Sequence, residues 1–324
     1  MNILVTGGAG YIGSITSNKL HNLGHKVIVL DDLSEGKQES IKKITFYKGS
    51  YGDKTLVYEI LNQHNIDTVM HFGASSNVKE STEKPELYYH NNVINSLNLL
   101  KTSRRYRKNN TLKFIFSSTA AVYGDLDTDV IKENRILNPV NPYGWSKLII
   151  EKALEDYYKS HNEEYLIFRY FCAAGATEHN GESRKSKETH LIPLVVESVI
   201  DNNKMVNIYG DDFNTQDGSG VRDYVHVEDI ATAHIKGMIQ WDDVKNNAYN
   251  IGTDIGYSVK EVIDKANEVF NTQIKTQVLG RRDGDPAKLI ACNNKFSKKF
   301  NWKPSMNLKD MLLTAYKWRK NPQY

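Results

Sequence analysis

The sequence predicts an α/β protein built on a doubly wound parallel sheet, followed by a smaller C-terminal α/β lobe. Strand-like and helix-like patterns alternate through residues 1–171, which is typical of a parallel sheet covered by helices on both faces. A glycine-rich turn joins the first strand to the first helix at residues 7–13. From about Cys172 polar, loop-rich stretches separate the helices. These observations divide the chain into a first domain over 1–171 and a smaller lobe over 172–324.

The strands of the sheet are expected where short runs of apolar and β-branched residues occur. They are 3–5, 26–30, 45–48, 68–72, 113–117 and 166–171. A further strand at 248–251 is expected to return to the first domain, within a segment near 223–254. Ligands of such sheets bind at the carboxyl ends of the strands, so the polar and glycine residues after each strand are where we expect chemistry.

Helices are expected where apolar residues recur at helical spacing. They are 15–23, 53–64, 85–107, 191–200, 227–241, 258–270 and 308–319. Pro142 is expected at the start of a further helix over 143–161, because proline suits the first helical position. Two polar stretches, 178–189 and 211–220, are expected to lack helices.

The composition excludes several classes of function. A chain of 324 residues with 40% hydrophobic and 25% charged residues is an ordinary globular protein, and its net charge of +3 favours neither nucleic acid nor membrane binding. Cys172 and Cys292 give no metal-ligand spacing, and the ten histidines form no H-E-x-x-H pattern, so no metal site is expected. No apolar run has membrane-spanning length and the first strand begins at residue 2, so we expect a cytoplasmic protein without a signal peptide.

Gly7, Gly10 and Gly13 are spaced G-x-x-G-x-x-G between the first strand and helix. Such a turn aims backbone N–H groups and the helix dipole at an anionic group, and it lets a pyrophosphate approach the chain closely. Asp31 and Asp32 end the second strand about 20 residues on, where a carboxylate binds the adenosine ribose and repels a 2′-phosphate. The pattern predicts a Rossmann-type domain that binds NAD rather than NADP. The alternatives are an ordinary glycine-rich turn and a solvated aspartate turn.

Tyr143 and Lys147 are four residues apart near the start of a predicted helix, so they lie on one helix face. A nearby ammonium favours the phenolate, and we expect it to lower the pKa of Tyr143 from about 10 toward neutrality, which makes a usable base. Thr119, at the tip of the preceding strand, offers a hydroxyl to the same substrate oxygen. Tyr316 and Lys320 share the spacing but lie in a terminal amphipathic helix. The alternatives are a chance pair at Tyr143 and a loop-capping role for Thr119.

Arginine is scarce beside lysine in the second half of the chain, so Arg222, Arg281 and Arg282 stand out. Guanidinium groups bind phosphate oxygens in a bidentate fashion, which makes these residues candidate pyrophosphate clamps. Asp285 is a candidate ligand for sugar-ring hydroxyls. The alternative is surface ion pairing between these arginines and neighbouring aspartates.

With these residues assembled, the chain closely resembles the UDP-glucose (UDP-galactose) 4-epimerases of the extended short-chain dehydrogenase/reductase family. The matching blocks span essentially the whole length. They are LVTGGAGYIGS (4–14), IDTVMHF (66–72), KPELYYHNNV (84–93), FIFSSTAAVYG (114–124), NPYGWSK (141–147), RYFCAAGA (169–176), ETHLIP (188–193), DGSGVRDYVHVEDIA (217–231) and GRRDGDPAKLIA (280–291). The last three are the most specific, because the whole superfamily shares the glycine turn and the Tyr/Lys pair.

The resemblance implies tightly held NAD, a UDP-sugar substrate and a homodimer built from the helices near 85–107 and 143–161. It implies that Thr119, Tyr143 and Lys147 are catalytic, with Tyr143 as the base. The implied cofactor-binding residues are Gly7, Gly10, Tyr11, Ile12, Gly13, Asp31, Asp32, Ser50, Tyr51, Phe72, Gly73, Ala74, Asn92, Ser117, Tyr143, Lys147 and Tyr170. The implied substrate-binding residues are Thr119, Tyr143, Cys172, His190, Leu191, Asn207, Tyr209, Arg222, Arg282, Asp285 and Leu289. The first domain then holds NAD, and the second lobe is mainly substrate-binding.

Three positions depart from the family's pattern. Cys172 stands in place of an Asn whose amide contacts the substrate, and a thiol is a poorer hydrogen-bond partner. Ser50 replaces the Asp that reads the adenine amino group, which implies somewhat looser cofactor binding. Leu289 lies where relatives set the room around the 2-substituent of the sugar, and its intermediate size leaves the acceptance of N-acetylated sugars open.

The implied reaction interconverts UDP-glucose and UDP-galactose by oxidation at C4 of the sugar, rotation of the keto sugar and re-reduction on its other face. A 4-epimerase acting on another UDP-sugar (an N-acetylhexosamine, a pentose or a uronic acid) is the main alternative. A sugar-nucleotide 4,6-dehydratase would need an acid just after Thr119, where Ala120 and Ala121 stand. A non-catalytic NAD-binding protein is the remaining alternative, although the three implied catalytic residues are intact.

Overall fold

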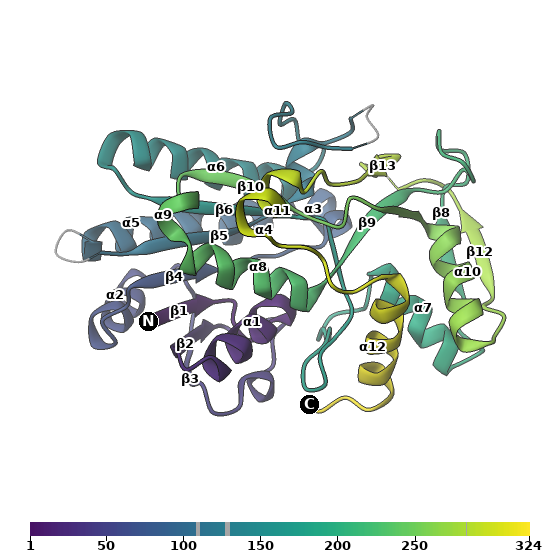
Figure 1. Ribbon diagram of the computed structural model, residues 1–324, viewed down its shortest axis with the longest axis horizontal. Helices are drawn as coiled ribbons and strands as arrows, with labels where there is room; N and C mark the ends of the chain where they lie inside the picture. Colours follow the sequence, from purple (N-terminus) through teal and green to yellow (C-terminus); the bar gives the residue numbers. More distant parts are fainter. Residues whose placement is uncertain (108–110, 127–129, 283) are drawn as a thin grey trace.

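The computed structural model describes residues 1–107, 111–126, 130–282 and 284–324. Its centre is a seven-stranded parallel sheet in the order β10-β6-β5-β4-β1-β2-β3 (Figure 1). The strands are β1 (Asn2–Thr6), β2 (Lys26–Asp31), β3 (Thr45–Lys48), β4 (Thr68–His71), β5 (Lys113–Thr119), β6 (Tyr165–Tyr170) and β10 (Asn247–Ile251). The chain winds outward from β1 in one direction and from β4 in the other. Such a reversal leaves a crevice at the carboxyl ends of the strands, and it confirms the predicted doubly wound fold.

Alternate side chains of each strand build separate cores on the two faces of this sheet. Ile3 and Val5 of β1 belong to one buried cluster, and Leu4 between them belongs to another. The first cluster includes side chains of α1 (Tyr11–Asn22) and α8 (Val227–Ile239), and the second those of α2 (Lys54–Gln63), α5 (Asn95–Arg107) and α6 (Pro142–His161). The sheet is therefore covered on both faces, which explains the apolar runs of its central strands, whereas the edge strand β3 (TFYK) is only partly buried.

The chain beyond residue 172 contributes a strand and helices to the large sheet and its cores, as well as forming the second lobe. The expected returning strand is β10, which pairs with β6 so that Asn247 lies opposite Leu166 and Ile251 opposite Tyr170. Helix α11 (Asn294–Phe300), which the sequence did not predict, adds Phe296 to the same core. The division at residue 171 stays a prediction.

The second lobe forms around a small sheet whose central strand is β9 (Val221–His226). Its neighbours are β7 (Cys172–Ala174), β11 (Gly256–Ser258) and β13 (Lys288–Leu289), and β8 (Val206–Tyr209) pairs separately with β12 (Thr276–Leu279). The helices are α7 (Leu191–Ile200), α10 (Val259–Phe270) and α12 (Leu308–Lys320), at the right of Figure 1. Apolar residues of these elements pack into a third core.

Most predicted elements lie within a few residues of their observed bounds, and the differences have local causes. The first helix begins at Tyr11, because the glycine turn is complete at Gly10. The predicted helix at 85–107 is α4 (Pro85–Tyr88), a π-helical turn η2 (Tyr89–Ile94) and α5. The short elements η1 (Gln38–Ile41), α3 (Val78–Glu83), η3 (Ala120–Tyr123) and α9 (Trp241–Val244) were not predicted as separate segments.

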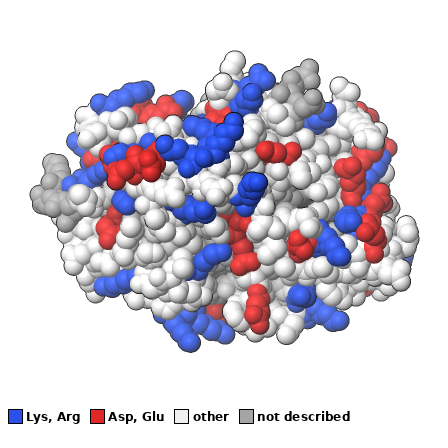
Figure 2. All heavy atoms as spheres, in the orientation of Figure 1, with Lys and Arg blue, Asp and Glu red and all other residues white. Residues whose placement is uncertain are grey.

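The surface agrees with the small net charge. Basic and acidic side chains are interspersed over the face drawn in Figure 2, which carries no broad field of one sign. Among the described residues, no helix has both the length and the apolar character needed to cross a membrane.

Candidate active site

The glycine-rich loop between β1 and α1 forms an open cradle. Gly7 has φ +69°, and a Cβ there would lie 2.5 Å from the Gly73 backbone nitrogen, while a Cβ at Gly13 would lie 2.2 Å from the Gly7 carbonyl oxygen. A Cβ at Gly10 would meet only that same oxygen, at 3.4 Å. Gly10 caps α1 without any side-chain hydrogen bond. Packing thus requires Gly7 and Gly13, whereas Gly10 borders free space before the N–H groups of Tyr11, Ile12 and Gly13, which fits a diphosphate.

The two aspartates at the end of β2 have different surroundings. The buried carboxylate of Asp31 accepts hydrogen bonds from the Ala9 N–H (3.0 Å) and the Leu33 N–H (2.8 Å), so it ties the strand to the glycine loop. Burial raises the pKa of Asp31. Asp32 is exposed, and its carboxylate accepts from the backbone N–H and the hydroxyl of Ser34. The environment of Asp31 therefore fits a ribose ligand, while Asp32 stabilises a surface turn.

The predicted cofactor residues after β3 and β4 lie against one another. The ring of Tyr51 packs on Gly73, where a Cβ would lie 2.6 Å from the ring, and its hydroxyl donates to the Asn91 carbonyl (2.7 Å). The Ser50 hydroxyl accepts from the Gly52 N–H at 3.0 Å. Ala74 follows Gly73 in the half-buried loop after β4. These residues form a wall at the strand tips beside the cradle.

Asn92 is almost completely buried and acts as a clamp inside the protein. Its side-chain amide exchanges hydrogen bonds with the backbone of Ser75 (2.8 and 2.9 Å) and donates to the Ser146 hydroxyl (3.0 Å). It sits in the π-helical turn η2. Asn92 thus holds the loop after β4 and the first turn of α6 in a fixed relation.

The N-terminus of α6 positions Tyr143 and Lys147. Asn141 caps the helix by accepting from the Gly144 N–H at 2.9 Å, and Pro142 occupies the first helical position as predicted. Lys147 is 3% exposed; its Nζ donates to the Ser117 carbonyl at 2.8 Å and lies 4.9 Å from the centre of the Phe116 ring. The helix therefore brings both side chains to the carboxyl end of β5.

Thr119 is the last residue of β5, and its side chain lies close enough to Tyr143 to act against the burial that raises the pKa of the phenol. Its hydroxyl oxygen also accepts from the Ala121 N–H at 3.2 Å, which caps η3. The Thr119 side chain therefore caps η3 and also lies beside Tyr143, so the loop-capping and catalytic interpretations do not exclude each other.

The pKa of Tyr143 differs from the sequence expectation. Burial raises it, and the Thr119 hydrogen bond and the charge of Arg184 only partly oppose this effect. Burial also lowers the pKa of Lys147 to about 7, against the opposing effect of Glu151. The expected lowering of the Tyr143 pKa by Lys147 is therefore wrong for the protein alone, because desolvation outweighs a cation that is directed toward the Ser117 carbonyl.

All three candidate arginines of the second lobe pair with aspartates, and two of them share Asp285. Arg222 on β9 approaches Asp285 (Nη2 to Oδ1, 3.4 Å), and Arg282 binds the other oxygen of that carboxylate (Nε to Oδ2, 2.9 Å). The Arg282 guanidinium lies 4.5 Å from the centre of the Tyr209 ring on β8. Arg281 instead pairs with Asp212 (2.6 Å) in an exposed position. Two cations and an aromatic face thus gather where a nucleoside diphosphate could bind.

The other predicted substrate residues surround this group. Leu289 on β13 pairs with Arg222 in the register of the small sheet, and Asn207 lies on β8 two residues before Tyr209. Cys172, at the start of β7, is half-buried; burial raises the pKa of its thiol to about 11 despite the charge of Arg222, so it is protonated at neutral pH. Leu191 begins α7 and packs against the core of the second lobe.

His190 belongs to an ionic cluster that the sequence did not reveal. Its Nδ1 lies 2.7 Å from the Glu182 carboxylate, which also binds Arg184 at 3.0 Å. Burial would raise the pKa of Glu182, but the charges of His190 and Arg184 hold it at about 2. Glu188 joins the group and could ligate a metal with Glu182 and His190, yet it is already paired with Arg319 (3.4 Å). The residues lie in the stretch expected only to be a loop, where charged residues carry no periodic signal.

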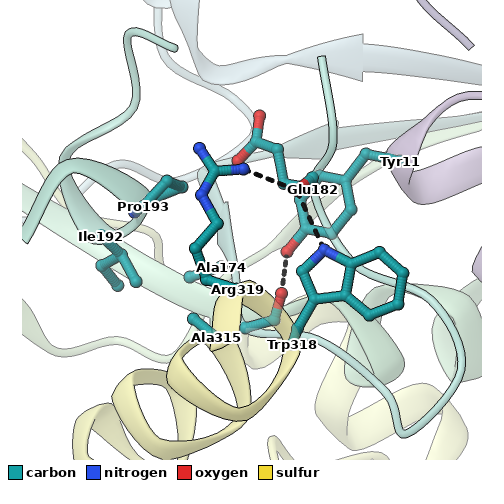
Figure 3. Close-up of a pocket in the computed structure, with 9 residues that line it drawn as sticks. Tyr11, Ala174, Glu182, Ile192, Pro193, Ala315, Trp318 and Arg319 are labelled. Atoms are coloured by element: carbon teal, nitrogen blue, oxygen red, sulfur yellow. Dashed lines mark hydrogen bonds between the residues drawn. The ribbon is translucent and has the colours of Figure 1, made fainter. Parts of the chain in front are cut away.

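The second lobe reaches the glycine cradle directly (Figure 3). The Tyr11 hydroxyl, from the first turn of α1, donates to the Gly175 carbonyl at 2.5 Å. On the same side, Trp318 of α12 donates its indole N–H to the Glu182 carbonyl at 3.1 Å, and Arg319 donates to the same oxygen. Tyr11 thus contributes its backbone to the cradle and its side chain to the contact between the lobes.

Comparisons with known proteins agree with this site. Residues 3–252 match the NAD dependent epimerase/dehydratase family. The chain is 42% identical to a UDP-glucose 4-epimerase of Halalkalibacterium halodurans over 99% of this chain and 96% of that protein. It resembles the crystal structure of UDP-glucose 4-epimerase from Bifidobacterium longum in complex with NAD+ and UDP (36% identity, TM-score 0.93, 100% and 99% of the two chains).

A third relative has a wider name. The UDP-Glc/GlcNAc 4-epimerase from Campylobacter jejuni is 36% identical, with a TM-score of 0.84 over 98% of this chain and 99% of that one. The family match covers most of the chain, and these likenesses extend over its full length. The protein therefore belongs to the NAD dependent epimerase/dehydratase family.

Proposed function

We propose that the protein interconverts UDP-glucose and UDP-galactose with NAD as a bound cofactor. Two groups of side chains carry the proposal: Tyr143, Thr119 and Lys147 near the carboxyl end of β5, and Arg222 and Arg282, which share Asp285 in the second lobe. The first group matches proton transfer at a sugar hydroxyl, and the second matches a diphosphate. Curated relatives that carry the name UDP-glucose 4-epimerase support it.

The cradle and the residues around it fit NAD. Gly10 leaves room for the diphosphate, Asp31 fits the adenosine ribose, and Phe72 and Tyr170 offer rings at the ends of β4 and β6. When bound, NAD supplies a hydride acceptor and a positively charged nicotinamide ring. The chain must retain the reduced cofactor between the two half-reactions, so that the cofactor acts catalytically.

The residues of the site have separate roles in this proposal. Tyr143 takes the proton of the sugar 4-hydroxyl, and Thr119 hydrogen-bonds the same oxygen. Lys147 is anchored to the Ser117 carbonyl, which fixes its ammonium beside the cofactor site. Arg222 and Arg282 exchange their contacts with Asp285 for the diphosphate, so the nucleotide stays fixed while the sugar turns.

A 4-epimerase that acts on a different UDP-sugar is the second candidate. The half-buried thiol of Cys172 and the intermediate size of Leu289 shape the sugar end of the site. The Campylobacter relative, whose name includes both UDP-Glc and GlcNAc, adds weight to N-acetylated sugars. The dehydratase alternative loses support because Ala120 and Ala121, which form η3 beside Thr119, carry no acid.

One assay separates these possibilities. Purified protein is incubated with UDP-galactose, without and with added NAD, and the products are separated by chromatography. We expect UDP-glucose to form without added NAD. No UDP-glucose even with NAD refutes the proposal, and preferred turnover of UDP-N-acetylgalactosamine in a parallel incubation selects the second candidate. Bound NAD without turnover of any UDP-sugar selects the non-catalytic alternative.

We also infer a homodimer and a cytoplasmic location. Helices α4 and α6 lie side by side with η2, and these elements expose several large apolar side chains, namely Leu87, Tyr89, Ile94, Trp145, Ile149 and Tyr158. Apolar side chains gathered on adjoining helices favour burial against a second copy. Light scattering should give twice the mass of one chain, and Ile149→Arg should reduce it to one. A monomeric parent protein would refute the dimer.

A further inference from the structure

A buried histidine on α8 contacts two of the predicted cofactor residues. The His234 side chain is 1% exposed. The centre of its ring lies 4.8 Å from that of Phe72 and 5.4 Å from that of Tyr170. Its Nε2 lies 2.7 Å from the Tyr170 hydroxyl oxygen. Phe168, which also lies on β6, packs on the imidazole at 4.6 Å.

The hydrogen bonds of His234 determine which nitrogen carries the proton. Nδ1 lies 3.0 Å from the Ile230 carbonyl oxygen, which can only accept, so Nδ1 holds the hydrogen. Burial lowers the pKa of His234 to about 4, so the ring is neutral at physiological pH. Nε2 is therefore an acceptor, and the Tyr170 hydroxyl donates to it.

This direction of donation connects α8 with the catalytic end of the sheet. The single hydroxyl proton of Tyr170 is used by His234, while the Ser117 side chain lies close enough to the Tyr170 hydroxyl to lower its pKa against the effect of burial. The carbonyl of Ser117 accepts from Lys147. Tyr170 also lies opposite Thr119 in the register of β5 and β6. One buried chain of contacts thus runs from His234 through Tyr170 and Ser117 to Lys147.

We propose that His234 is a positioning residue for the cofactor pocket, which orients Tyr170 by accepting its hydroxyl proton and supports the Phe72 ring by packing. The proposal rests on the proposed function only in taking Phe72 and Tyr170 as residues that contact NAD. In this role His234 touches neither cofactor nor substrate. It couples α8, a helix from the second half of the chain, to NAD affinity.

The test measures NAD binding instead of turnover. The full chain is dialysed until its NAD is released, and the dissociation constant is determined by titrating NAD back and recording the heat. His234→Phe keeps an aromatic ring but leaves the Tyr170 hydroxyl without its acceptor. Loss of a partner by a buried polar group predicts a dissociation constant about 5- to 100-fold higher than that of the parent protein. His234→Gln places an amide oxygen near the Nε2 position and should restore most of the affinity.

A double-mutant cycle separates positioning from general damage. If His234 acts through Tyr170, the double variant His234→Phe/Tyr170→Phe should bind NAD within about twofold of Tyr170→Phe alone. The control is His226→Ala, at the N-cap of the same helix, where the side chain accepts from the Glu228 N–H. It should lower the melting temperature without changing the NAD dissociation constant.

Several outcomes overturn the proposal. Additive effects in the cycle, an unchanged dissociation constant in His234→Phe, or an equal loss of affinity in His226→Ala would each do so. Parent protein that binds NAD but leaves UDP-galactose unchanged would refute the proposed function, and the NAD dissociation constants of the variants would still test the role of His234. Parent protein that binds no NAD would overturn both.

Discussion

A methyl group added at Gly10 or at Gly13 tests the glycine cradle directly, because the two positions have different surroundings. The Cβ of Gly13→Ala would lie 2.2 Å from the Gly7 carbonyl oxygen and 2.9 Å from the Gly8 Cα. Both are backbone atoms, so no side-chain rotation relieves the clash. The Cβ of Gly10→Ala would meet a single atom, at 3.4 Å.

These distances predict that Gly13→Ala lowers the stability of the protein, whereas Gly10→Ala mainly lowers its affinity for NAD. Gly10 has φ −78° and ψ 179°, which alanine adopts without strain. A gain of about 0.4–1 kcal/mol from the unfolded state offsets the weaker N-cap, so the free energy of unfolding should change by less than about 1 kcal/mol. Gly13→Ala should cost about 1–3 kcal/mol through overpacking. A methyl group before the helix N-terminus blocks the close approach of a diphosphate, so Gly10→Ala should weaken NAD binding at least about tenfold, or 1.4 kcal/mol.

Both quantities are measured on the same preparations. Urea unfolding of NAD-free protein gives the free energy of unfolding, and titration calorimetry gives the NAD dissociation constant. If Gly10→Ala protein binds NAD as tightly as the parent protein, the open space at Gly10 does not hold the diphosphate of NAD. Gly10→Ala protein destabilised as much as Gly13→Ala would refute the geometric argument itself.

Three further predictions concern the rest of the site. Tyr143→Phe should reduce UDP-galactose turnover by about 10²–10⁴-fold, the contribution of a general base, while NAD stays bound; a fully active variant would exclude this base. Arg222→Lys should weaken UDP binding about tenfold in calorimetry through loss of a bidentate contact, whereas Arg107→Lys, in a half-buried ion pair with Glu163, should not; equal effects would contradict the clamp. The pKa of Glu182 is about 2 in the folded protein against 4.5 for the free side chain, so its stabilising contribution is complete above pH 4.5 and is lost as the pH falls toward 2. Glu182→Gln should remove about 2 kcal/mol of the difference in unfolding free energy between pH 7 and pH 3, measured by urea unfolding, and an unchanged dependence would contradict the assignment.

The positions of the strands in the large sheet were predictable because each local pattern agrees with its final environment. The central strands of the large sheet are apolar on both faces, the helices bury apolar stripes against it, and α2 and α6 begin at side-chain N-caps. The short strands of the second lobe lack such a pattern. β13 has two residues, and β12 is largely exposed, so their pairing depends on contacts with β9 and β8 instead of on their own sequence. The π-helical turn η2 is similar, since the buried contacts of Asn92 accompany it within a continuous helical pattern.

Sequence spacing placed the proposed catalytic side chains on one helix face but could not give their electrostatics. The four-residue interval places Lys147 on the same helix face as Tyr143, yet the direction of its ammonium is decided by the Ser117 carbonyl at the end of another element. The burial of both side chains then decides the sign of their pKa shifts. The compensating cation in the protein is Arg184, which lies in a polar loop more than forty residues away in the sequence. Desolvation outweighs both Thr119 and Arg184, so the pKa of Tyr143 is raised, which the four-residue spacing alone could not predict.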